Sequence, residues 1–306
     1  VSVNAGVRGE YTNDKMHISV KDASRDIERL NLFPSVHLSY EAPGGNIISA
    51  GYSYRVARPG IWELEPYITY EDYYTKKIGN PDIRPEYIHS AELSYRKRFN
   101  ADNSLKFTGY YRRRNDVRER VRVAYEPGVT LDSLINAGHD HTVGLEANAT
   151  LKPARWWNMV ANASIYNYRF FSTFVGCTDN SILSYTASLM NAFTAGKTTR
   201  IQFDANVVGP RILSQGREEG YFYFTLALRQ QLLKNKLSAS LVANDIFRAA
   251  KYYNSLISPT LNSRTYVRPK YPNILLSLTY SFNAGGQHKN SGGTISSGAL
   301  FEGKDF

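Results

Sequence analysis

The chain has 306 residues, and its 37 Lys and Arg against 27 Asp and Glu give a formal net charge of +10. Its mean hydropathy is −0.41 and its longest apolar run is four residues, whereas a membrane-spanning helix needs about 20, so helical membrane proteins are excluded. The single cysteine, Cys177, excludes an intramolecular disulfide framework, and the dispersed basic residues do not favour nucleic-acid binding.

Alternation of polar and apolar residues recurs along the chain, and helical periodicity is almost absent. In the segment 141–151, for example, Val143, Leu145 and Ala147 alternate with Thr142 and Glu146. The pattern predicts twelve strands, at 2–12, 32–42, 47–57, 86–99, 104–114, 141–151, 156–169, 182–194, 199–209, 220–231, 236–246 and 272–283.

The connections between these strands alternate in length. Five are short and turn-like, at 43–46, 100–103, 152–155, 195–197 and 233–235. Six are longer, at about 13–31, 58–85, 115–140, 170–181, 210–219 and 247–271. Outer-membrane β-barrels have this alternation of connection lengths, with tight periplasmic turns and long extracellular loops. We expect a barrel portion at 1–283 and a flexible, Gly/Ser-rich periplasmic tail at 284–306.

Alternation alone does not distinguish a membrane barrel from a soluble β-sandwich, whose apolar face points inward. The predicted strands have about 10–14 residues, closer to the 9–11 of a membrane strand than to the 5–6 of a globular one. Charged residues lie in the middle of the polar face, and aromatic residues gather near both strand ends on the apolar face. We therefore predict an all-β fold, a transmembrane antiparallel β-barrel located in the bacterial outer membrane, where strands must close on one another.

Two long connections hold candidate binding residues. The connection at 58–85 is rich in aromatic side chains that suit ligand contact, Trp62, Tyr67, Tyr70, Tyr73 and Tyr74. The alternative is that its prolines fix the loop while the aromatic rings pack it. The arginines between 113 and 122 suit lipopolysaccharide phosphates or another anionic ligand, or else belong to a solvated hairpin that extends the strand.

No motif marks a catalytic, metal or cofactor site. His139 and His141 form a lone His-x-His pair without a third ligand at a defined spacing, so a polar loop is favoured over a metal site. Neither His37 nor His89 has a serine that its spacing singles out for hydrolysis. We therefore expect a protein that is not an enzyme and has no cofactor.

Several segments together resemble the outer-membrane barrel of Bacteroidetes TonB-dependent receptors, at 32–40, 48–59, 70–86, 92–95, 110–116 and 278–282. The motif within them has a fixed order, Arg58, Pro59, Gly79, Asn80, Pro81, Pro85 and Glu86. The resemblance implies a transporter with a 22-stranded barrel around a plug that receives energy through TonB. It implies contact with outer-membrane lipid and lipopolysaccharide, and a surface lipoprotein is a further expected partner.

The resemblance covers only about twelve strands and no plug, so we expect the C-terminal portion of such a barrel. Such a portion is either a fragment or one half of a two-chain barrel, and these two readings are favoured. The alternative is that twelve strands close alone as a passive channel or surface-binding scaffold. An outer-membrane hydrolase is a weaker alternative. We expect the motif residues to be structural, and the lumen to be lined by Arg8, Arg55, Glu92, Arg96, Arg98, Arg112, Glu146, Arg200, Asp204 and Arg229.

Overall fold

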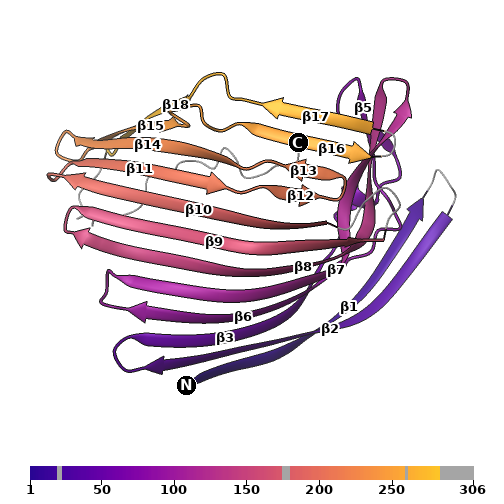
Figure 1. Ribbon diagram of the computed structural model, residues 1–306, viewed down its shortest axis with the longest axis horizontal. Coiled ribbons are helices and arrows are strands. Elements are labelled where there is room, and N and C mark those ends of the chain that lie inside the picture. The colour runs from indigo at the N-terminus through magenta and orange to yellow at the C-terminus, as the bar shows by residue number, and fades with distance from the viewer. Residues whose placement is uncertain (19–22, 174–179, 259–260, 283–306) are drawn as a thin grey trace.

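The computed structural model describes residues 1–18, 23–173, 180–258 and 261–282, so the predicted tail at 284–306 lies outside the described residues. Twelve strands follow one another in a single antiparallel sheet (Figure 1). They are β1 (Ser2–Ile18), β2 (Ala23–Ala42), β3 (Asn46–Ala57), β6 (Glu86–Arg98), β7 (Ser104–Glu126), β8 (Val129–Ala154), β9 (Trp157–Ser172), β10 (Asn180–Ala195), β11 (Thr199–Val208), β14 (Tyr221–Leu232), β15 (Leu237–Asn244) and β18 (Asn273–Tyr280). Each predicted strand is therefore present.

The long connections contain more structure than the alternation predicted. The segments 13–31 and 115–140, expected as loops, are largely strand, because β1–β2 and β7–β8 continue their pairing far beyond the sheet (Figure 1). For 115–140 the structure thus has the protruding hairpin, and strand pairing alone does not decide which ligand its arginines bind. The remaining connections hold the short helix α1 (Ile61–Leu64) and six short strands, β4 (Ile68–Tyr70), β5 (Thr75–Ile78), β12 (Arg211–Leu213), β13 (Gly216–Glu218), β16 (Tyr252–Ser258) and β17 (Leu261–Val267).

The strand register separates an apolar outer face from a polar inner face. One row of residues crosses six neighbouring strands, and each residue is paired with the next one. All six are apolar: Trp157, Phe193, Ile201, Leu228, Leu241 and Leu276. On this face Leu145 is 64 % exposed and Leu226 is 41 % exposed, and no described element covers them. On the other face Ser184 and Thr225 are buried. A soluble sandwich shows the reverse arrangement, because it buries its apolar face against a second sheet.

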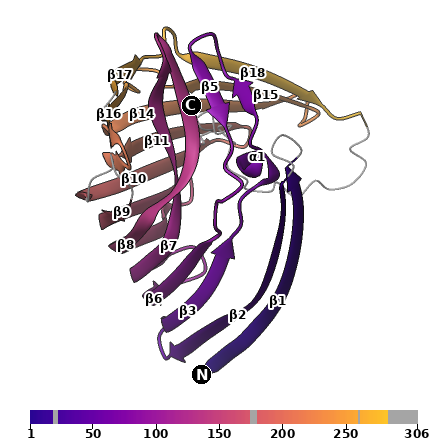
Figure 2. The same ribbon diagram turned by 90° about the vertical axis from the view of Figure 1, so that its right-hand side faces the viewer.

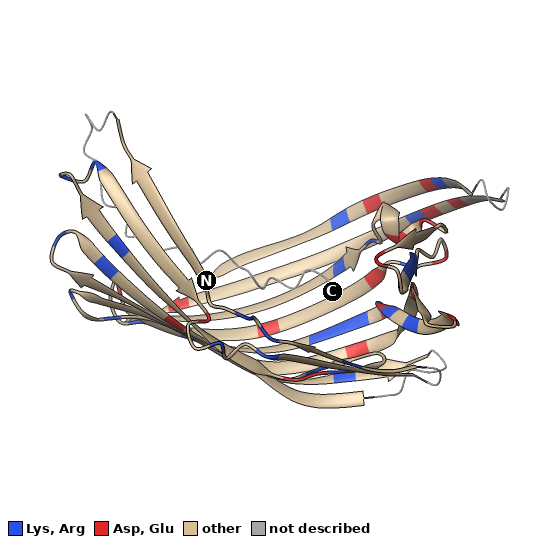
Figure 3. Ribbon diagram, turned by 90° about the horizontal axis from the view of Figure 1, so that it is seen from above, with Lys and Arg blue, Asp and Glu red and all other residues tan. Residues whose placement is uncertain are grey.

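The sheet curves into an open arc with β1 at one edge and β18 at the other (Figure 2). No pairing joins these two edge strands within the described part of the chain. Seen from above, the sheet forms a trough in which acidic and basic positions intersperse at the end that carries the long connections (Figure 3). The fold is thus an all-β antiparallel sheet of the outer-membrane barrel type. Among the described helices, none has the length and apolar composition needed to cross a membrane.

Candidate functional site

The inner face of the sheet carries a continuous polar wall. Direct cross-strand pairing aligns Asn148, Asn162, Ser188, Asn206 and Tyr223 in one row. The amide of Asn148 donates to Oδ1 of Asn162 at 2.9 Å, and the amide of Asn162 donates to the hydroxyl of Ser188 at 3.1 Å. This ladder of amides and hydroxyls places hydrogen-bonding groups at regular spacing along the inner face.

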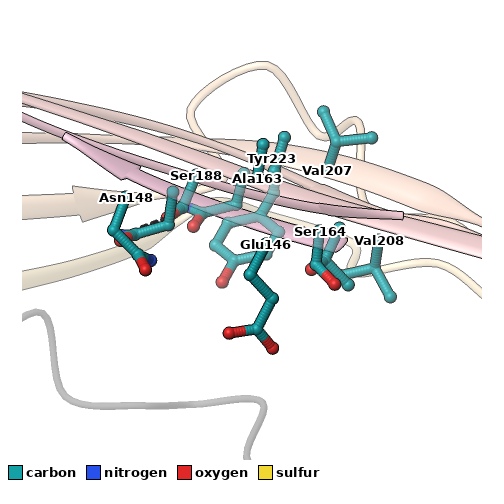
Figure 4. Close-up of a pocket in the computed structure, with 12 residues that line it drawn as sticks. Glu146, Asn148, Ala163, Ser164, Ser188, Val207, Val208 and Tyr223 are labelled. Carbon is teal, nitrogen blue, oxygen red and sulfur yellow. Dashed lines mark hydrogen bonds between the residues drawn. The ribbon is translucent and has the colours of Figure 1, made fainter. Parts of the chain in front are cut away.

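A shallow cavity of about 360 Å³ lies over this polar row (Figure 4). Figure 4 shows Glu146, Asn148, Ser164 and Ser188 pointing to the same side, while Val207 points to the other. Its lining mixes polar side chains with aliphatic ones such as Ala163 and Val208, and this open, mixed surface suits water or a polar partner better than a mostly apolar small molecule. The other predicted lumen residues belong to the same set of inward strand positions, Arg8, Arg55, Glu92, Arg96, Arg98, Arg112, Arg200, Asp204 and Arg229.

The connection between β3 and β6 is fastened to the β7–β8 hairpin by residues of the sequence motif. The backbone amides of Gly79 and Asn80 donate to the carbonyls of Glu65 and Glu63 at 2.9 and 2.7 Å. The Asn80 side chain donates to the carbonyl of Leu134 on β8 at 3.0 Å. A Cβ at Gly79 would lie 2.6 Å from the Glu65 carbonyl oxygen, so the close approach requires glycine. We refer to residues 60–65 and 79–86, with their partners on β7 and β8, as the clasp.

Buried charge completes the clasp. Glu86 is 7 % exposed and accepts a hydrogen bond from the backbone amide of Arg118 at 2.6 Å. The Arg118 guanidinium forms an ion pair with Glu63, whose carboxylate also accepts from the Gly60 amide at 2.8 Å and so caps α1. Because these partners come from three separate segments, the clasp holds the α1 segment against the sheet, inside the arc seen in Figure 2.

A second buried ion pair lies beside the clasp on the inner face. Asp140 is fully buried and accepts from Nε of Arg114 at 2.8 Å and from the hydroxyl of Tyr168 at 3.0 Å. Arg114 also lies 4.0 Å from Glu86, which connects this pair to the clasp. Beyond it, Arg122 forms a two-pronged ion pair with Asp132, and the hydrogen-bonded carboxylate raises the pKa of that guanidinium.

The other motif residues lie around the same connection. Arg58 donates to Glu10 on β1 and lies 3.3 Å from the Thr12 hydroxyl. Pro85 is buried directly before Glu86, whereas Pro59 and Pro81 are half-buried. Asn136 on β8 also binds the connection, next to the motif residue Pro85. It accepts a hydrogen bond from the Arg84 amide at 2.8 Å and donates one to the Arg84 carbonyl at 3.0 Å.

The five aromatic residues predicted to bind a ligand do not converge on one point. Trp62 lies on α1 and is 79 % exposed, Tyr70 ends β4, and the rings of Tyr73 and Tyr74 meet edge to face at 5.1 Å in the turn before β5. Tyr67, between α1 and β4, is 44 % exposed. They form an exposed aromatic surface on the connection, and none of them lines the cavity over the polar row.

Residues far apart in sequence form contacts that alternation does not reveal. Tyr168, Asp132 and Gln215 carry no local signal, yet Gln215 of the β12–β13 turn accepts from the Arg122 amide at 2.7 Å. Arg114 ends the predicted strand 104–114 and Asp140 directly precedes the predicted strand 141–151, so the closeness of these two strand ends is the signal that could have suggested their pairing. Within the described residues, no group of three or more His, Cys, Asp or Glu side chains is placed to hold a metal ion.

Solved structures with the same fold are outer-membrane receptors and transporters of about twice the length. The iron transporter FrpB of Neisseria meningitidis matches with a TM-score of 0.61 and 16 % identity, over 92 % of this chain and 43 % of its own. The siderophore receptor PirA of Pseudomonas aeruginosa matches with 0.58 and 16 %, over 91 % and 49 %. The ferric yersiniabactin uptake receptor FyuA of Yersinia pestis matches with 0.58 and 14 %, over 87 % and 41 %. This chain thus spans less than half of each.

The sequence comparison agrees with the structural one. No curated protein matches the chain. The outer membrane protein beta-barrel family matches residues 1–280, which include every described strand of the main sheet. With its apolar face outward and its polar face inward, the chain belongs to the outer membrane protein beta-barrel family and is located in the outer membrane.

Proposed function

We propose that this chain is the C-terminal barrel portion of a TonB-dependent outer-membrane transporter that takes up a nutrient of the metal-chelate, peptide or glycan class. The observation that carries the proposal is the open twelve-stranded arc, which has a polar inner face and two edge strands that are not paired with each other. This arc matches less than half of the length of each iron or siderophore receptor named above. Because an open edge is not tolerated in lipid, the proposal assigns further strands that pair with β1 and β18.

The proposal assigns the inner face to a plug and to the substrate pathway. The lumen residues named from the sequence, with Glu146 in the cavity of Figure 4, contact the plug or line the route of the substrate. The motif residues keep the connection at 58–85 in place, and the exposed aromatic rings of that connection meet the ligand from outside. Energy reaches the plug through TonB, the protein acts without catalysis, and the parent barrel is of the 22-stranded, Bacteroidetes type.

The edge strands provide a structural test. In a Cys177→Ser background, one cysteine is placed on β1 and one on β18, and a short bis-maleimide that joins two thiols is added to intact outer membranes. We expect no cross-link between the two edges within one copy, because further strands separate them. Cross-links between β1 and β18 within one copy would instead establish the self-closed alternative.

Growth of a deletion strain provides the functional test. Cells lacking the gene are grown with ferric chelates, peptides or glycans as the limiting nutrient, beside cells lacking TonB. We expect one nutrient class to fail in both strains. A general change in permeability without TonB dependence would favour a passive channel, and loss of a hydrolysis product would favour an enzyme.

A further inference from the structure

A row of basic side chains crosses the outward face of the sheet, on the side opposite to the lumen. Direct strand partners define it, because His89 pairs with Arg113, Arg113 with His141, and His141 with Arg169. Alternate residues of a strand share a face, and Arg113 follows the outward-facing, 40 % exposed Tyr111 by two positions. We call these four residues the outer basic row.

The outer basic row lies at the end of the membrane-crossing stretch. A tilted strand crosses the hydrocarbon layer in about 9–11 residues, and this length separates Trp157 at the turn of β9 from Arg169. The outward positions between them begin as apolar residues and turn polar only beside the row, Met159, Ala161, Ala163, Ile165 and Asn167. The row therefore stands at the level where the lipid headgroups of the outer leaflet lie.

Neighbouring side chains fix the four basic groups. The Tyr52 and Tyr111 hydroxyls lie 2.9 and 2.6 Å from Nδ1 of His89 and His141. Nε of Arg113 donates to Asn115 at 3.0 Å, and Arg169 makes the same contact with Asn167 at 3.2 Å. These bonds hold each imidazole at Nδ1 and each guanidinium at Nε, which leaves Nε2 and the Nη nitrogens as the groups that can face a ligand.

The charge of the outer basic row is not balanced by nearby carboxylates. Neither of the adjacent outward rows contains an acidic residue, since their described members are Tyr52, Ala91, Tyr111, Val143, Asn167 and Leu183 on one side and Tyr87, Asn115, His139 and Phe171 on the other. Arg113 and Arg169 take part in no ion pair among the described residues, whereas Arg114, Arg118 and Arg122 of the same arginine run are each paired with a carboxylate. Both arginines of the row are exposed.

We propose that the outer basic row binds the phosphate groups of the phosphorylated glycolipid, lipopolysaccharide, that surrounds the barrel in the outer leaflet. Guanidinium groups bind phosphate oxygens in a bidentate manner, and Arg113 and Arg169 lie two strand spacings apart, about 10 Å, so that one phosphorylated headgroup spans them. The exposed apolar rows directly below receive the acyl chains. The proposal does not depend on which nutrient the barrel transports.

The test measures lipopolysaccharide binding by the full chain, extracted from outer membranes in mild detergent and stripped of lipid. Arg113→Gln with Arg169→Gln removes the row's fixed charge, and Arg155→Gln with Lys197→Gln, both exposed in short turns at the opposite end of the sheet, is the matched control. We expect about tenfold weaker binding for the first variant, since its charge-assisted hydrogen bonds to phosphate are lost, and unchanged binding for the control. Phosphatase-treated lipopolysaccharide should bind the unaltered protein as weakly as it binds the first variant.

Three results would overturn the proposal. One is unchanged affinity of the row variant, confirmed as folded by heat-modifiable gel mobility. Another is equal binding of native and phosphatase-treated lipopolysaccharide, which would assign binding to the acyl chains. The third is displacement of lipopolysaccharide by inorganic phosphate alone, which would identify a small-anion site. Should the glutamine pair fail to fold, Arg113→Lys with Arg169→Lys keeps the charge but loses bidentate geometry, and reduced binding is still expected.

Discussion

The two ends of the same sheet are held together by different forces. On the side of the short turns, strands are joined by the backbone ladder and by local side-chain caps, as where Asn100 accepts from the amides of Asp102 and Asn103 at 2.9 Å each. At the outer end, buried ion pairs link segments that are far apart, as between Arg118 and Glu63. Within lipid, every backbone polar group must be hydrogen-bonded inside the sheet. Outside the membrane this requirement does not apply, and side chains form the contacts between distant segments. Changes at the two ends should therefore differ in kind and in size.

The largest effect is expected at Asp140, which is the central acceptor of the inner-face ion pair. Asp140→Ala leaves the half-buried Arg114 guanidinium without its carboxylate, and breaking a buried pair in this way costs about 3–5 kcal/mol. The measurement is urea unfolding of the protein in detergent micelles, followed by tryptophan fluorescence.

The matched control for this change is Tyr168→Phe, which removes only the 3.0 Å hydrogen bond to Asp140. A neutral hydrogen-bond donor to a charged acceptor contributes less, about 1.5–3 kcal/mol at most, so its effect should be the smaller one. Equal effects of the two changes would show that the charge of Asp140 is not what stabilises this region.

A somewhat smaller effect is expected from a charge on the outer face of the membrane-crossing part. Leu145 is 64 % exposed near the middle of β8, and arginine on the lipid face near the bilayer midplane costs about 2–4 kcal/mol. Leu145→Arg should therefore reduce the yield of heat-modifiable, folded protein. Asn148→Arg, on the inner face of the same strand, should not. The reverse result would place lipid on the polar face and contradict the assignment of inside and outside.

The membrane-crossing part was predictable from sequence because lipid imposes a period-2 pattern on each strand. All twelve strands appear where alternation places them, and the short turns separate them as expected. Outside the membrane the alternation continues into the β7–β8 hairpin, where Val117 and Ala137 are buried in a small apolar cluster with Phe170. The sequence therefore offered an extended hairpin as one of two alternatives, but the pattern did not fix that β7 continues to Glu126.

The clasp was less predictable from the sequence than the membrane-crossing strands. The sequence motif predicts structural roles for Gly79 and Glu86, and these roles remain a prediction. Both residues form hydrogen bonds to the backbone of other segments. Arg118, which bonds to Glu86, and Asn136, which bonds to Arg84, belong to a hairpin whose position depends on three-dimensional packing. The members of the arginine run divide between the two faces of the sheet, with Arg113 outward and Arg114 inward, which the run alone does not indicate.

An intermediate effect is expected at Gly79, where the clasp approaches the backbone most closely. In Gly79→Ala the new Cβ would lie 2.6 and 2.8 Å from the carbonyl oxygens of Glu65 and Glu63, and such overpacking costs about 1–3 kcal/mol. We expect faster limited proteolysis within 58–85. Gly60→Ala is the control, because no atom lies within 4 Å of its Cβ position, and its cleavage rate should stay unchanged. Equal cleavage of both variants would mean that the clasp does not restrain the connection.

The smallest effect is expected at Glu119, which lies on the protruding part of β7, beyond the membrane. Burial raises the pKa of its carboxyl by more than Arg114 and the Ser214 hydroxyl lower it. Because the folded protein then holds the proton more tightly than the unfolded chain does, the group stabilises the fold below its unfolded pKa. That contribution is lost as the pH rises through the folded pKa.

Glu119→Gln should therefore raise the urea midpoint slightly near pH 7.5, where the native carboxyl must ionise in its buried position. Near pH 3.5 both proteins carry a neutral group at this position, so their midpoints should coincide. Glu126→Gln on the same hairpin is the comparison, since Glu126 binds Lys76 at 3.0 Å and its loss should not raise the midpoint at either pH. A Glu119→Gln protein that is less stable near pH 7.5 would show that the attraction of Arg114 outweighs burial, and that the hairpin depends on charge pairs throughout.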